Sequence, residues 1–142
     1  MTEPSLAFAF DNLRCGMELP PLSLAISTSA IVAGAIASGD FELVHHDKTA
    51  AQERGTPDIF MNILTTNGYL QRFVSDWVGS TGRIRSVEIR LGVPAYAGDT
   101  LKLSGVVRSK QRVGTEGLVE IAVTGTNSLG EHVAATVRVA LP

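Results

Sequence analysis

Residues 59–77 read Ile-Phe-Met-Asn-Ile-Leu-Thr-Thr-Asn-Gly-Tyr-Leu-Gln-Arg-Phe-Val-Ser-Asp-Trp, and this stretch decides the fold class. Its apolar residues recur at roughly helical spacing. The pattern predicts one long amphipathic helix that begins after Pro57-Asp58 and is stopped by residues 79–82, Gly-Ser-Thr-Gly. Gly68 in its interior costs about 1 kcal/mol of helix propensity relative to alanine. We therefore expect another element to pack closely against Gly68.

Strand patterns follow this helix to the end of the chain. Alternating apolar and polar residues predict four strands, over residues 83–91, 101–107, 118–126 and 132–141. The last two are expected to form a hairpin across residues 127–130. One long helix followed by several amphipathic antiparallel strands predicts an α+β fold, in which the sheet wraps around the helix. This arrangement resembles the hot-dog fold.

The N-terminal half carries signals for an extended segment and two shorter helices. Residues 17–26 contain alternating leucine and isoleucine, which favours an extended lead-in. A helix over residues 30–37 is predicted, with Thr28 or Ser29 as its cap. That helix is apolar on all sides, so we expect it to be buried over most of its surface. A short polar helix is predicted from Asp47, its cap, to Arg54.

Length and composition limit the classes of function. A chain of 142 residues that is 44% apolar is expected to form one domain, spanning 1–142. The net charge of −2 and scattered Lys and Arg residues offer no electrostatic basis for binding nucleic acid. A single cysteine, Cys15, excludes an internal disulfide. Neither a basic leader nor an apolar stretch of about 20 residues is present, which predicts a cytoplasmic protein with no membrane segment.

Candidate chemistry is concentrated in residues 39–47, Gly-Asp-Phe-Glu-Leu-Val-His-His-Asp. Asp40 stands five positions before His45, directly after the helix predicted over 30–37. A carboxylate and an imidazole on one loop can share a water molecule and move its proton, as general acid–base chemistry requires. The pair alone leaves a second reading open, in which Asp40 caps a turn and His45 is an ordinary loop histidine.

No metal site or bound cofactor is predicted. His45, His46 and Asp47 are adjacent, so their side chains diverge, and the sequence offers no further cluster of ligands. His46 and His132 are expected to be structural or surface residues, and Asp99 is expected to lie in a turn before its strand.

Three stretches resemble the MaoC-like family of (R)-specific enoyl-CoA hydratases. Ser38-Gly39-Asp40-x-x-x-Val44-His45-x-Asp47 is similar to the family's hydratase signature, with Glu42-Leu43 where the family usually has Asn-Pro. Leu19-Pro20-Pro21 and residues 94–101 also fit, so the resemblance covers nearly the whole chain.

This resemblance implies that Asp40 and His45 form a catalytic pair. They would add water across the α,β-double bond of an acyl-CoA, with CoA entering as part of the substrate. It also implies that backbone amides at the start of the long helix, around Asn62 and Ile63, bind the thioester oxygen. Ile63 stands where many family members have glycine, which keeps the amide but narrows the space beside it.

A narrower resemblance concerns the small MaoC-like subunit of an actinobacterial hydratase of steroid side-chain degradation. It rests on residues 44–47, 58–65, 76–79 and 89–94. It implies a steroid side-chain enoyl-CoA as substrate, from cholesterol catabolism. It also implies a second, different MaoC-like subunit, for example in an α2β2 heterotetramer, and an aldolase reached through that partner. A homodimer is the alternative assembly.

Two other functions fit the same fold. Hot-dog thioesterases also act on acyl-CoA and often carry a carboxylate on or near the long helix, where this chain has Asp58 and Asp76, with Asn62 between them. A non-catalytic subunit that completes another chain's pocket is the second possibility. Fold does not distinguish these activities, because function depends on the site. The intact pair of Asp40 and His45 favours hydration.

Overall fold

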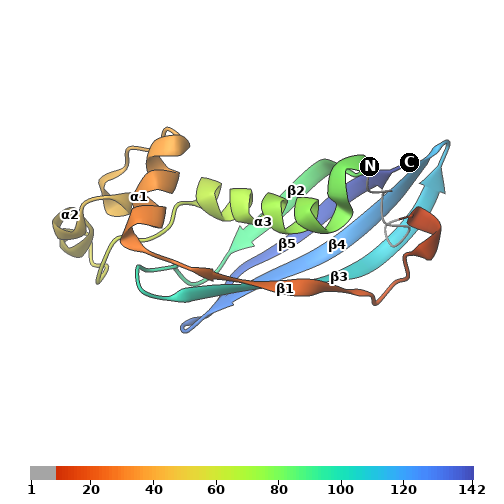
Figure 1. The fold of residues 1–142 in the computed structure, drawn as a ribbon. Helices are drawn as coiled ribbons and strands as arrows, with labels where there is room; N and C mark the ends of the chain where they lie inside the picture. The colour runs from red at the N-terminus through yellow and green to blue at the C-terminus, as the bar shows by residue number, and fades with distance from the viewer. Residues whose placement is uncertain (1–8) are drawn as a thin grey trace, which may run out of the picture.

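A long helix lies across one face of a five-stranded antiparallel sheet. The computed structural model describes residues 9–142, in which helix α3 (Ile63–Val78) covers the sheet (Figure 1). The strands are β1 (Glu18–Ala25), β2 (Arg83–Leu91), β3 (Thr100–Val113), β4 (Glu116–Asn127) and β5 (Gly130–Leu141). Their order across the sheet is β1-β3-β4-β5-β2. The predicted α+β hot-dog architecture is therefore confirmed.

The four predicted strands are all present, and the extended lead-in is a fifth. β2 spans the predicted residues, whereas β3 continues to Val113 because it pairs with β4 along its full length. Asn127 pairs with Gly130 at the predicted hairpin turn. β1 and β2 form the two edges of the sheet. β1 carries Pro20 and Pro21 at a break in its register, a feature that makes an edge strand a poor partner for another chain.

The core lies between α3 and the sheet. Helix α3 buries Leu70, Phe73, Val74 and Val78. The facing side chains are those of Leu101, Leu103, Val107, Val119, Ile121, Val123, Val133, Val137 and Val139, all at most 2% exposed. Burying each such side chain contributes about 1.5–3 kcal/mol, so this contact supplies most of the stability of the helix. A Cβ atom at Gly105 would lie 3.0 Å from the Phe73 ring and 3.3 Å from the Leu19 side chain, so a larger residue there would require these side chains to shift.

Helix α3 starts at Ile63, four residues after the predicted start. The preceding residues are extended instead: Phe60 forms a β-bridge with Tyr96, and the Met61 amide donates to the Ala95 carbonyl over 2.9 Å. Asn62 then caps the helix by accepting from the Thr65 amide. Apolar periodicity did not reveal this boundary, because Ile59 is buried in the extended segment as it would be in a helix. The predicted end is correct, and Gly79 closes it with φ of 71°.

Helix α1 (Thr28–Ala37) corrects two further expectations. Its cap is Ser27, whose hydroxyl accepts from the Ala30 amide, rather than Thr28 or Ser29. It buries only Ile31 and Ala35, so the expectation of burial on most sides was wrong. Helix α2 (Lys48–Glu53) is capped by Asp47 as predicted. Both helices lie at the end of the molecule opposite the C-terminus (Figure 1).

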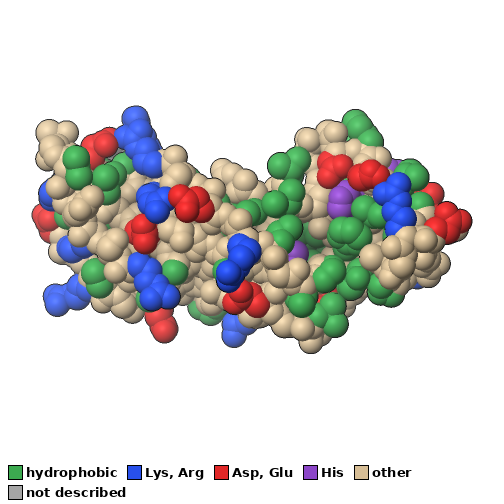
Figure 2. Space-filling model, turned by 180° about the vertical axis from the view of Figure 1, so that it is seen from behind, with side chains coloured by type: hydrophobic (Ala, Val, Ile, Leu, Met, Phe, Trp, Pro, Cys, Tyr) green, Lys and Arg blue, Asp and Glu red, His purple; other side chains and the backbone are tan. Residues whose placement is uncertain are grey.

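Exposed apolar side chains gather at this same end (Figure 2). Five of them are large and 43–70% exposed: Ile36, Phe41, Leu43, Ile63 and Leu64. We call them the apolar rim. Isolated exposed apolar residues are normal, whereas a group of this kind indicates a binding surface.

Gly68 has open space beside it, so the expectation of close packing was wrong. A Cβ atom there would meet nothing within 4 Å. The close contact between helices is made by Gly34 of α1, where a Cβ atom would strike the side chain of Thr65. Within residues 9–142, no helix has the length and apolar character needed to cross a membrane.

Candidate active site

Asp40 is held in place by the chain reversal at the end of α1. Gly39 takes φ of 71°, a left-handed conformation that favours glycine, and the Asp40 amide donates to the Ala35 carbonyl over 2.9 Å. The Oδ1 atom of Asp40 accepts from the Glu42 amide over 3.2 Å. This leaves Oδ2 directed toward the next turn of the chain, Leu43–His45.

His45 is buried, and the orientation of its ring is determined by a backbone carbonyl. Its Nδ1 atom lies 2.7 Å from the Phe60 oxygen. Because a carbonyl oxygen can only accept, Nδ1 carries a proton, and in the neutral form of the ring the lone pair lies at Nε2. That Nε2 atom lies 3.4 Å from Oδ2 of Asp40. The structure thus brings together the two residues predicted from the sequence, with Nε2 of His45 beside Oδ2 of Asp40.

Asn62 links Asp40 to the start of α3. Its Nδ2 atom donates to Oδ2 of Asp40 over 3.1 Å and to the Ser38 hydroxyl over 2.9 Å. Its Oδ1 atom accepts from the Thr65 amide over 3.0 Å. One side chain, only 2% exposed, therefore caps the helix and orients the carboxylate.

The pKa of the Asp40 carboxyl is held below its ordinary value. The hydrogen bond from Asn62 is the largest cause, followed by the bond from the Glu42 amide, and the nearby His45 adds a smaller effect. Partial desolvation opposes these effects. All three favourable contacts stabilise the charged form, so Asp40 is a carboxylate at neutral pH.

The first turn of α3 offers backbone donors beside this pair. The first N–H groups of a helix have no acceptor within it, and the helix dipole makes them attractive to negative charge. Asn62 occupies the Thr65 amide with its side chain and the Thr66 amide with its carbonyl. The amides of Ile63 and Leu64 are the remaining donors of this turn. The Ile63 side chain is 47% exposed, so it extends toward the surface.

A groove of about 570 Å³ runs between α1 and α3 next to the site. Its α1 wall consists of small residues, and Gly68 opens its α3 wall. The groove reaches the candidate site through Ser38 and Thr65, which line it and also hydrogen-bond to Asn62. Gly68, which was expected to mark close packing, instead lines this groove.

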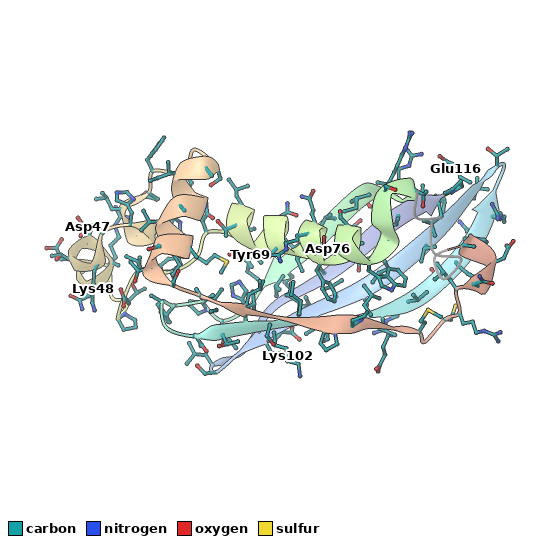
Figure 3. The ribbon with its side chains drawn as sticks, viewed as in Figure 1. Asp47, Lys48, Tyr69, Asp76, Lys102 and Glu116 are labelled. Carbon is teal, nitrogen blue, oxygen red and sulfur yellow. The ribbon has the colours of Figure 1, made fainter. Side chains whose placement is uncertain are left out.

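The rival carboxylates are not part of this arrangement. Asp58 lies 3.6 Å from Lys48 and accepts from the amide of Ile59. Asp76 is 68% exposed and pairs with Arg72. At 1.5 Å per residue, it lies about 20 Å along the helix from Asn62, toward the end away from Asp47 (Figure 3). His46 is exposed.

Two contributors to the site were missed by the sequence analysis. The Phe60 carbonyl orients His45, and a backbone acceptor has no residue signature. Ser38 was considered only as part of a motif, yet its hydroxyl accepts from Asn62. Over residues 9–142 there is no group of three His, Cys, Asp or Glu side chains that could hold a metal ion.

Three comparisons relate the chain to known proteins. The MaoC like domain family matches residues 15–128. The chain is 45% identical, over 89% of its length and 95% of the relative, to the 3-oxo-4,17-pregnadiene-20-carboxyl-CoA hydratase beta subunit of Mycobacterium tuberculosis. In the crystal structure of the ChsH1-ChsH2 complex from Mycobacterium tuberculosis, one chain matches at 44% identity and a TM-score of 0.85, with coverage of 91% of this chain and 98% of that one. The R-hydratase PhaJ1 from Pseudomonas aeruginosa shares the fold, with a TM-score of 0.85 at 19% identity and coverage of 95% and 86%.

Proposed function

Because the chain belongs to the MaoC-like domain family, we propose that it is the catalytic subunit of an enoyl-CoA hydratase. The observation that carries this proposal is the pairing of Asp40 Oδ2 with Nε2 of His45, 3.4 Å apart. In the neutral form of the ring, both atoms are hydrogen-bond acceptors. Two neighbouring acceptors can both bind one water molecule, which donates one O–H to each. The water oxygen is then left with its lone pairs directed away from both residues.

In the proposed reaction this water attacks Cβ of the enoyl thioester. A bond forms between the water oxygen and Cβ, while the π electrons of the double bond move toward the thioester oxygen. The Asp40–His45 pair takes up one proton from the water and delivers one proton to Cα. The product is a 3-hydroxyacyl-CoA, and both residues return to their starting protonation states.

The first turn of α3 would bind the developing enolate oxygen. The Ile63 and Leu64 amides lie at the positive end of the helix dipole, and Asn62 joins this turn to Asp40. Hydrogen-bond donors that already point to the place where negative charge develops lower the activation barrier, because the protein does not have to reorganise during the reaction. Because the Ile63 side chain extends toward the surface, it leaves its own amide available.

The acyl group is proposed to be a steroid side-chain enoyl group. The support is the 45% identity to a hydratase subunit named for a pregnadiene carboxyl-CoA, together with the groove of about 570 Å³ beside the site. The small side chains on the α1 wall leave room for a polycyclic group.

The assembly is proposed to be a heteromer with a second MaoC-like chain. The support is the match to a protein named as a beta subunit and to a chain of a two-component complex. The apolar rim around the site is a surface that a second hot-dog unit can cover. The product also carries its hydroxyl on Cβ, which is the functional group that a retro-aldol enzyme requires. We therefore place an aldolase after this step, contacted through the partner.

A test separates hydration from thioester hydrolysis. The chain is purified together with a co-encoded MaoC-like partner and given a short enoyl-CoA and a steroid enoyl-CoA. We expect the absorbance of the conjugated enoyl thioester to disappear without release of free CoA thiol. Stoichiometric thiol release that is abolished by Asp58→Asn or Asp76→Asn, but not by Asp40→Asn, would instead establish a thioesterase. Full activity of the complex with Asp40→Asn would show that this chain is a non-catalytic partner.

A further inference from the structure

His132 is a buried histidine that the proposed chemistry does not use. It lies on β5 and is 2% exposed. Its Nδ1 atom is 2.7 Å from the Val93 carbonyl, so Nδ1 carries a proton. Its Nε2 atom is 2.9 Å from the Thr66 hydroxyl, and the two form a hydrogen bond. One imidazole thus connects β5, the segment after β2 and the first turn of α3.

The two partners of His132 lie on either side of residues 60–62. Thr66 belongs to the first turn of α3, and its amide donates to the Asn62 carbonyl over 3.2 Å. Val93 leads into Ala95, whose carbonyl accepts from the Met61 amide over 2.9 Å. Residues 60–62 are therefore held from the helix side and from the strand side at once.

Those same three residues orient the candidate catalytic pair. The Phe60 carbonyl accepts from His45, and the Asn62 side chain donates to Asp40. A shift of residues 60–62 would therefore change the position of both groups together. A displacement of about 1 Å at a reacting group can cost on the order of 10²-fold in rate.

We infer that His132 is a positioning residue, which fixes residues 60–62 through Thr66 and Val93 so that Asp40 and His45 stay within reach of one water molecule. This inference rests on the proposed hydration. The role requires two hydrogen-bonding nitrogens on opposite sides of one rigid ring, one for the Val93 carbonyl and one for the Thr66 hydroxyl. An apolar residue of the same shape would leave the buried Val93 carbonyl without its donor. It would also remove the shortest hydrogen bond of the Thr66 hydroxyl, whose other partners, the Met61 sulfur and the Asn62 carbonyl, are both 3.4 Å away.

The test compares Thr66→Val with Thr66→Ser in the complex with the MaoC-like partner. Valine keeps the volume and removes the hydroxyl, whereas serine keeps the hydroxyl. We expect Thr66→Val to lower kcat about 5- to 20-fold with KM changed less than about 2-fold, because substrate contacts are unchanged while the pair is misplaced. Thr66→Ser should restore kcat, and His132→Phe should resemble Thr66→Val.

Val119→Ala provides a control for stability alone. Val119 is buried on β4. It is six positions away from Gly125, and Gly125 is the β4 residue that pairs with Val133, the neighbour of His132. It should lower the melting temperature and leave kcat unchanged. Equal melting temperatures and unequal kcat values for Val119→Ala and Thr66→Val would support positioning. A Thr66→Val variant that loses stability but keeps its kcat would overturn it.

A second readout does not depend on activity. In protein labelled at its imidazole nitrogens, NMR measures how fast the Nδ1 proton of His45 exchanges with solvent. We expect faster exchange in Thr66→Val, because the Phe60 carbonyl is held less firmly, and a wild-type rate in Thr66→Ser. If the wild-type complex hydrates no enoyl-CoA, the proposed function fails and this measurement alone decides the inference. An unchanged exchange rate in both Thr66→Val and His132→Phe would refute it.

Discussion

At the scale of single residues, the site depends on which side-chain atoms of Asp40 and His45 can still form a hydrogen bond with a water molecule. Asp40 and His45 each spend one polar atom on a structural hydrogen bond, to the Glu42 amide and the Phe60 carbonyl. Oδ2, which also accepts from Asn62, and Nε2 lie 3.4 Å apart. Both side chains sit at the ends of short turns rather than in the core between α3 and the sheet, so replacing them should affect chemistry more than folding.

Asp40→Asn and His45→Ala should each lower kcat on the order of 10²-fold or more, the usual loss for a positioned acid or base. Steady-state hydration by the assembled complex measures this. Circular dichroism melting of the same variants should remain close to wild type. Hydration at the wild-type rate in either variant would show that the pair is not the catalytic centre.

Asn62→Ser should raise the pKa of the Asp40 carboxyl toward its ordinary value. Serine remains a good helix cap, but the amide donor that most lowers this pKa is lost. Because the folded-state pKa lies below the unfolded one, Asp40 contributes stability at neutral pH that is lost as the pH falls through the folded value. In the variant this loss should begin at higher pH. Titration of the Asp40 carboxyl carbon by NMR measures the change, and an identical titration curve would contradict it.

At the scale of elements, two glycines of the neighbouring helices α1 and α3 have different surroundings. Gly34 of α1 faces Thr65 so closely that a Cβ atom would lie 2.2 Å from its hydroxyl oxygen. Gly68 of α3 faces open space in the groove. The same substitution should therefore have opposite effects at the two positions.

Gly68→Ala should stabilise the isolated chain by about 0.5–1 kcal/mol, since alanine favours the helix and meets no neighbour. Gly34→Ala should destabilise it by about 1–3 kcal/mol, because Thr65 must move and give up its contact with Asn62. Urea unfolding of both variants provides the comparison. Equal shifts of the same sign would show that the α1–α3 contact is looser than described.

At the scale of the whole molecule, the unpaired surfaces lie around the site. The apolar rim is one of these surfaces, and its Leu64 also lines the groove. The β2 edge carries no proline between Arg83 and Leu91, unlike β1. Exposed strand edges and apolar patches are where protein chains associate, and substrate clefts commonly form at such interfaces.

The chain should therefore not be a functional monomer, and it should prefer a MaoC-like partner over itself. Light scattering of the chain alone, of the partner alone and of their mixture measures this directly. We expect the mixture to form one heteromeric species whose hydration rate exceeds that of either component. An active monomer at micromolar concentration, with no gain on adding the partner, would contradict the prediction.

Local sequence signals were sufficient for the existence of the strands, for most of the turns and caps, and for the proximity of Asp40 and His45. They did not give the full length of β3, which runs to Val113 rather than to residue 107. The period-2 pattern predicted β2 to the residue, and Asp47, Gly79 and residues 127–130 marked turns and caps correctly. These features depend on neighbours along the chain, so sequence alone determines them. Asp40 and His45 were found for the same reason, because one short loop carries both.

Tertiary structure decided the rest, because those features depend on residues that are distant in sequence. Helix α3 begins at Ile63 since Met61 pairs with Ala95, and α1 stays exposed since only Ile31 and Ala35 reach the core. Asn62 donates a hydrogen bond to Asp40, 22 positions earlier in the chain, only because α3 begins next to the end of α1. Likewise His132 meets Thr66 across 66 positions. The local sequence pattern determines which side chains a segment carries. Packing between distant segments determines which of these side chains contact one another, and so which of them belong to the site.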